Sequence, residues 1–94
     1  METAVTLLAR AEKMAPSDPS ANKCWRLVVR AIDAGWMQKR HFAAIAAALK
    51  KGNGYGVEEL IFEPSGSEVE VSFLGERARC PSTPLIKALE QLAA

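Results

Sequence analysis

Two cysteines and one histidine are the residues whose types could support nucleophilic or metal chemistry. Cys24 and Cys80 are far apart in the sequence, neither belongs to a CxxC pair, and neither has a zinc-ligand spacing to His41. A Cys24–His41 nucleophile pair would need an accessible thiol in an electropositive setting. Reduced structural cysteines and a histidine outside any reactive site are the simpler interpretation. The sequence therefore predicts no catalytic residue, no metal site and no cofactor.

Two pairs of glutamates and a glycine-rich segment could also carry chemistry. Glu58 with Glu59 and Glu68 with Glu70 offer neighbouring carboxylates, but the solvated side of a strand pattern explains them. Residues 52–56 hold three glycines, yet they lack the lysine and hydroxyl residue of a phosphate-binding loop and precede a strand rather than a helix. We interpret this segment as a helix stop and a hinge.

The stretch 57–75 organises the chain, because it is the only stretch with a β-sheet pattern. Apolar and polar residues alternate over 68–73, and Leu60 and Phe62 alternate with other residues in the same way. Proline, serine and glycine at 64–66 supply turn chemistry between the two arms. The pattern predicts a β-hairpin over about 57–75. An isolated hairpin is marginally stable in water, so helices must cover its apolar face.

Helical periodicity lies on both sides of this hairpin. Three helices are expected within about 3–51, the second starting at Asp18-Pro19 and ending near Gly35. A last helix is expected over about 83–93, with Thr83 as its cap. In the first helix, the residues expected on the core face are Val5, Leu8, Ala9 and Ala11. Elsewhere the expected core consists of Trp25, Val28, Ile32, Phe42, Ile45, Leu49, Leu60, Phe62, Val71, Phe73, Leu85 and Leu89.

These elements predict one small α+β domain over residues 1–94, in the order α-α-α-β-β-α. A helical half at about 3–51 connects through the glycine-rich 52–56 to the hairpin, and the helices pack on one face of that antiparallel hairpin. No apolar run approaches the roughly 20 residues that span a bilayer. The N-terminus lacks the basic region of a signal peptide. We therefore expect a cytoplasmic protein without a membrane partner.

The small net charge hides an asymmetry between the two halves. Residues 1–51 contain nine basic and four acidic residues, a net charge of +5. Residues 52–94 contain three basic and seven acidic residues, a net charge of −4. The candidate contacts to an anion or nucleic acid are Lys23, Arg26, Arg30, Lys39, Arg40, Lys50 and Lys51. A solvated helix face is the competing interpretation of these charges.

Trp36 and Tyr55 are the candidate contacts to another protein, because both aromatic residues stand beside glycines near expected helix ends. A tryptophan that closes the core is the alternative for Trp36. The leading hypothesis is a non-enzymatic protein-interaction module, a regulator, adaptor or inhibitor of bacterial or phage type. The alternative is a nucleic-acid-binding regulator that uses the basic face of the second and third helices. The unpaired edges of a small sheet also predict a homodimer.

Overall fold

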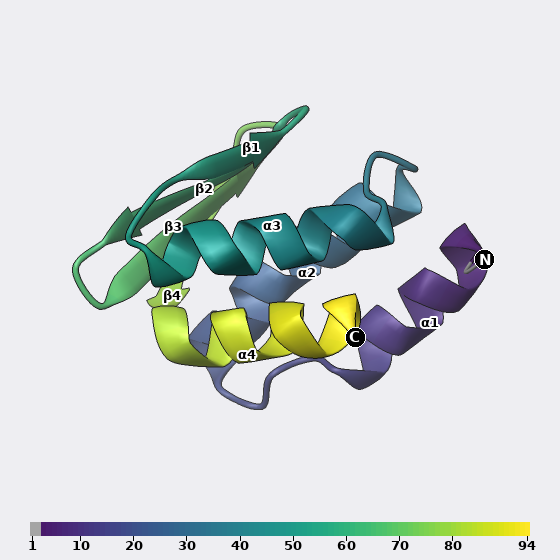
Figure 1. Cartoon of the computed structure of the whole chain (residues 1–94), viewed down its shortest axis with the longest axis horizontal. Helices are drawn as coiled ribbons and strands as arrows, with labels where there is room; N and C mark the ends of the chain where they lie inside the picture. The colour runs from purple at the N-terminus through teal and green to yellow at the C-terminus, as the bar shows by residue number, and fades with distance from the viewer. Residues whose placement is uncertain (1–2) are drawn as a thin grey trace.

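In the computed structural model of the chain, which describes residues 3–94, four helices and one antiparallel four-stranded sheet make up the fold (Figure 1). The helices are α1 (Ala4–Lys13), α2 (Pro19–Asp33), α3 (Lys39–Lys50) and α4 (Ser82–Ala93). The strands are β1 (Tyr55–Val57), β2 (Leu60–Ser65), β3 (Glu68–Phe73) and β4 (Glu76–Pro81), in the sheet order β1-β2-β3-β4. The predicted α+β class, with helices on one face of an antiparallel sheet, is confirmed.

The sheet has two strands more than the predicted hairpin, which is a correction. The hairpin is the central pair β2–β3, whereas β1 forms partly inside the expected hinge and β4 forms from residues that follow the predicted hairpin. The chain folds back between β3 and β4 because Leu74 and Gly75 both have positive φ, 50° and 87°. Two successive positive φ values are the signature of a type I′ turn, which joins antiparallel strands tightly.

The other two turns of the sheet also differ from expectation. The turn predicted at 64–66 lies at Gly66 and the following serine, and Pro64 belongs to β2. Gly66 has a φ of 61°, which places the turn at the residue best able to adopt it. The first predicted arm is interrupted by a turn at Glu58, which has a φ of 53°.

Strand alternation orients the sheet as expected. The side chains of Leu60, Phe62, Val69, Val71 and Phe73 point to one face and are buried there, and the twelve core residues predicted outside the first helix are all buried. In Figure 1, helices α2, α3 and α4 lie on this side of the sheet, with α3 in front of α2, whereas α1 packs against α2 and α4. The other face is lined mainly by polar side chains, with Ile61 39% exposed, and no helix within residues 3–94 covers it.

Helix α1 is rotated relative to the prediction. Leu7 and Ala11 face the core, whereas Val5 and Ala9 are exposed and Leu8 is half-buried. The Trp25 indole N–H donates a hydrogen bond of 2.7 Å to the Ala11 carbonyl. Leu7 and Ala11 are four residues apart and therefore lie on one side of the helix, and the Trp25 bond fastens this side of α1 to α2.

Local capping sets the ends of the helices. Gly35, with a φ of 84°, follows α2, and the Trp36 N–H donates to the Ala31 carbonyl at 3.2 Å. This is the Schellman arrangement, in which the residue after the glycine packs back against the helix. The first turn of α4 begins at Ser82 rather than after Thr83, because the Ser82 N–H and hydroxyl both donate to the Ser67 carbonyl.

Candidate protein-interaction site

Phe73 is the centre of a cluster at the end of the sheet where β3 turns into β4. The Trp36 ring meets the Phe73 ring edge-on, with centroids 5.3 Å apart and an interplanar angle of 66°. The Arg30 guanidinium carbon lies 5.4 Å from the Phe73 ring centroid, and Arg30 also forms an ion pair with Glu76. Edge-on aromatic contact and cation–π contact both favour this geometry. The cluster joins α2, the segment after it and both strands.

Leu74 projects from this cluster into solvent. Its side chain is 57% exposed, and its φ of 50° lies in the left-handed region that leucine rarely adopts. The buried Phe73 precedes it and Gly75 follows it in the turn. Leu74 is therefore a large apolar side chain held outside the core by a turn whose conformation favours asparagine or glycine. More than half of its surface is therefore open to solvent.

A groove runs between α2 and β4, and we call it the α2–β4 groove. It is an open hollow of about 440 Å³. Its lining comprises Lys23, Arg26, Leu27 and Arg30 from α2, with Glu76, Arg77 and Ala78 from β4. Four of these side chains are basic and one is acidic, and that acid, Glu76, is paired with Arg30. The groove therefore has an excess of positive charge that an anionic group could meet.

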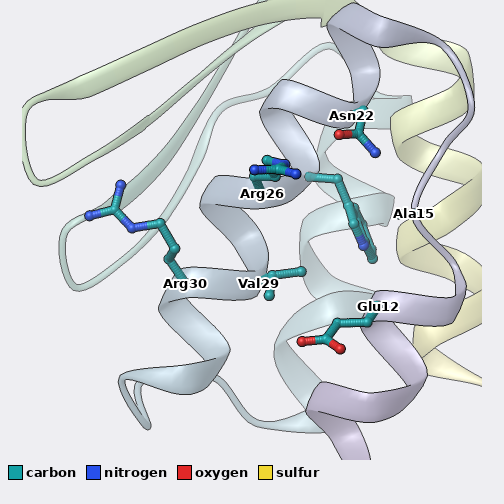
Figure 2. A pocket seen from close by; sticks show the side chains of 7 residues that line it. Glu12, Ala15, Asn22, Arg26, Val29 and Arg30 are labelled. Carbon is teal, nitrogen blue, oxygen red and sulfur yellow. The ribbon is translucent and has the colours of Figure 1, made fainter.

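A second hollow of about 410 Å³ lies on the other side of α2, between this helix and α1. In Figure 2, Glu12 points across it from α1 toward α2, whereas Arg30 extends from α2 in the other direction. Arg26 and Arg30 line both hollows. These two arginines thus form a ridge along the exposed side of α2 that a ligand could approach from either hollow.

The two predicted protein contacts do not form one patch. Trp36 and Tyr55 are both half-buried and pack against the core. Tyr55 lies on β1 opposite Phe62 of β2, whereas Trp36 contacts Phe73 of β3 on the far side of β2. Trp36 therefore belongs to the cluster beside the α2–β4 groove, and Tyr55 belongs to the opposite edge of the sheet.

The seven predicted anion contacts are divided between two helices. Lys23, Arg26 and Arg30 line the α2–β4 groove together with Arg77, whereas those on and just after α3 do not line it. Lys50 forms an ion pair with Glu90 of α4. Arg77 was not predicted as a site residue, because the sequence pattern did not indicate that β4 folds back beside β3. The Leu-Gly pair at the end of the alternating stretch was the available signal.

His41 and the two cysteines have structural surroundings. The Gln38 N–H donates to His41 Nδ1 at 2.9 Å, which caps the start of α3. Desolvation, followed by the Arg40 charge, lowers the pKa of His41. Cys24 and Cys80 are both buried, and the interaction with Cys24, together with burial, raises the pKa of the Cys80 thiol. The thiol partner of Cys24 is thus Cys80 rather than His41.

The two glutamate pairs and the glycine-rich segment lie at separate places in the structure. The Glu58–Glu59 turn joins β1 to β2, whereas Glu68 begins β3 at the opposite end of the sheet, so the two pairs do not converge. Glu70 lies near Arg79, with a nitrogen–oxygen distance of 3.6 Å. Among residues 3–94 no group of three or more histidine, cysteine or acidic side chains could hold a metal ion. Gly52, with a φ of 77°, ends α3.

Comparison with known proteins found no matching family model, no matching curated protein and no matching solved structure. Within the described part of the chain, no helix is long and apolar enough to cross a membrane.

Proposed function

We propose that this chain is a non-enzymatic protein-interaction module that regulates, adapts or inhibits another protein. The observation that carries the proposal is Leu74, an exposed apolar side chain at an unfavourable φ on the tip of a tight hairpin. Strained positions of this kind concentrate at functional sites, where the surrounding structure maintains them. A turn selected only for stability would hold asparagine at this position.

The residues around Leu74 support the same proposal. Trp36 is half-buried and Arg30 is exposed, and both contact Phe73 beside the turn. Tryptophan and arginine are the residue types most enriched among interface residues that dominate binding energy. Leu74, Trp36 and Arg30 together offer an apolar tip, an aromatic edge and a cation that already lies in a defined geometry. A partner would gain contacts here without ordering a flexible segment.

Nucleic-acid binding is the second candidate, and the positive charge of the α2–β4 groove favours it. It ranks second because the basic residues of α3 do not line the groove and Lys50 is paired with Glu90. An exposed leucine also has no evident use against phosphates. A nucleic-acid site would show a log affinity that falls with log salt by about 0.7–0.9 for each phosphate contact.

Leu74→Asn tests the protein-binding proposal without endangering the fold, because asparagine suits a positive φ. The chain is immobilised and exposed to lysate of the organism that encodes it, and captured proteins are quantified by mass spectrometry. We expect a partner that is captured by the wild type and by Val5→Thr, a control at another exposed apolar residue on α1. Leu74→Asn and Trp36→Ala should each reduce the capture, by roughly 2 kcal/mol of binding free energy for the tryptophan.

Two outcomes would overturn the ranking. Equal capture by the wild type and Leu74→Asn would remove Leu74 as the observation behind the proposal. Salt-sensitive binding of the wild type to single-stranded or duplex DNA at physiological salt, lost in a Lys23→Glu, Arg26→Glu double variant, would place nucleic acid first.

A further inference from the structure

The free edge of β4 is open to an additional strand. The Ser82 N–H donates to the Ser67 carbonyl at 2.9 Å, so this pair is hydrogen-bonded across the β3–β4 ladder. Hydrogen-bonded and non-hydrogen-bonded pairs alternate along an antiparallel ladder. In the observed register, the backbone groups of Cys80 and Ala78 are therefore hydrogen-bonded to β3, whereas the backbone groups of Arg77 and Arg79 are not. The backbone N–H and C=O groups of these two arginines therefore point away from β3, toward the edge.

The α2–β4 groove lies beside this edge. Lys23, Arg26 and Arg30 form its wall on the α2 side, and Arg77 contributes from the edge strand itself. A chain paired with β4 would present alternate side chains toward α2 and toward the open face of the sheet. On the first side those side chains would meet the cations of α2. On the second side they would meet Arg79 and also Arg77, which lies on the open face by strand alternation but borders the groove at the edge of the sheet.

We infer that the α2–β4 groove binds an acidic, extended segment of a partner protein, which pairs with the free edge of β4. This inference rests on the proposed function and names the partner's chemistry and its binding mode. Backbone hydrogen bonds to the edge supply affinity that does not depend on sequence, and acidic side chains facing the cations supply specificity. Leu74 stands where β4 begins, so a segment in the groove would pass beside the exposed apolar tip.

An acidic peptide suits the groove better than a nucleic-acid backbone does. The lining includes the apolar Leu27 and Ala78, against which alternate side chains of a peptide can pack, whereas phosphates that follow the full length of the groove would meet this apolar surface. An edge strand also offers N–H and C=O groups in alternation, which a peptide backbone matches and a phosphodiester backbone does not.

The composition of β4 explains why an acidic partner would be selected. Arg77, Arg79 and Pro81 lie along the free edge, and charged residues and proline on an edge strand discourage pairing with a second copy. Two β4 strands would bring arginines of both copies together, and like charges directly opposite each other are destabilising. A strand rich in glutamate or aspartate escapes this repulsion.

The test uses the full chain and a fluorescein-labelled octapeptide of alternating glutamate and threonine. Fluorescence anisotropy measures its binding, and we expect affinity that decreases as salt rises. Two peptides serve as controls, one with lysine in place of glutamate and one N-methylated at alternate backbone nitrogens, which blocks strand pairing. Both should bind at least about ten-fold more weakly, because they remove the charge contacts or the backbone hydrogen bonds.

Variants separate the charge contribution from the edge contribution. Arg26→Glu should weaken peptide binding about ten-fold, whereas Lys51→Glu, outside the groove, should leave it unchanged. Arg79→Pro removes an outward N–H that makes no ladder bond, and proline is tolerated at such edge positions. It should bind about three- to ten-fold more weakly than Arg79→Ala, which loses only the side chain. Urea denaturation confirms that each variant is folded.

The outcomes distinguish this inference from the proposed function. Equal binding of the glutamate peptide and its N-methylated form would overturn strand pairing. Absence of peptide binding, or preference for single-stranded DNA over the glutamate peptide, would overturn the acidic-segment inference. A third outcome is possible in the lysate experiment. If Leu74→Asn weakens capture of the partner but Arg26→Glu does not, the proposed function stands and this inference fails.

Discussion

The Trp36 ring packs edge-on against the Phe73 ring, 5.3 Å between centroids, and this contact ties the end of α2 to the end of β3. Trp36 reaches it because Gly35 reverses the chain after the helix. The guanidinium of Arg30 contacts the same phenyl ring at 5.4 Å. One phenylalanine thus holds in place the aromatic and basic residues that flank the exposed Leu74.

Phe73→Ala should lower the free energy of unfolding by about 3–5 kcal/mol, because Phe73 is 2% exposed and its truncation leaves a cavity at the centre of this cluster. Urea denaturation measures the change. Ile61→Ala, on the open face of the sheet, is the matched control and should cost much less. A loss below about 1 kcal/mol for Phe73→Ala would mean that the cluster is not packed as described.

Leu74→Asn should raise the free energy of unfolding by about 1 kcal/mol, since asparagine adopts a φ near 50° with less strain than leucine. Glu58→Gly relieves a comparable φ of 53° in the first turn of the sheet and should stabilise the chain similarly. Thermal and urea unfolding of both variants measure these gains. An unchanged or lower stability of Leu74→Asn would show that leucine carries no strain at the tip.

Asp18→Asn should remove part of the acid sensitivity of the fold. The Asp18 carboxylate accepts hydrogen bonds from the Ser20 hydroxyl at 2.6 Å and the Ala21 N–H at 2.9 Å, and these lower its pKa below the ordinary value of 3.8. A group with a lowered folded pKa stabilises the fold above its ordinary pKa, and that contribution is lost as the pH falls through the folded pKa.

Asparagine can also cap α2 but does not titrate. The stability difference between the wild type and Asp18→Asn should therefore shrink as the pH falls below about 4, measured by urea denaturation at each pH. A difference that stays constant from neutral pH to the acid limit of folding would contradict this prediction.

A homodimer stays a prediction of the free sheet edges, and we expect it to use β1 rather than the arginine-bearing β4. Light scattering over a concentration series measures the mass. Gly56→Lys adds a charge to the β1 edge, where a Cβ would meet neighbours only at ordinary contact distances of 3.8 Å and more. It should shift the dimer to monomer, whereas Arg79→Pro should not. A wild-type monomer at every concentration would remove the prediction.

The sequence by itself determined the features that depend on near neighbours in the chain. Alternation over 68–73 assigned the buried face of β3 correctly, and the spacing of Trp25, Val28 and Ile32 assigned the buried stripe of α2. Asp18 and Gly35 marked the two ends of that helix. The sequence alone predicts these features because helix caps and side-chain periodicity depend on the backbone geometry of a single helix or strand.

Only the tertiary structure decided which elements meet. The side of α1 that is buried follows from its packing against α2, to which the Trp25–Ala11 hydrogen bond fastens it, and the proximity of the two cysteines follows from α2 packing on β4. The α2–β4 groove combines Arg26 with Arg77, which are far apart in the chain and have no periodic relationship. Its existence depends on the tight turn at Leu74, which folds β4 back beside β3. Long-range pairing of this kind is set by the packing of the whole core, so the Leu-Gly pair could have indicated a turn but not that β4 would lie beside α2.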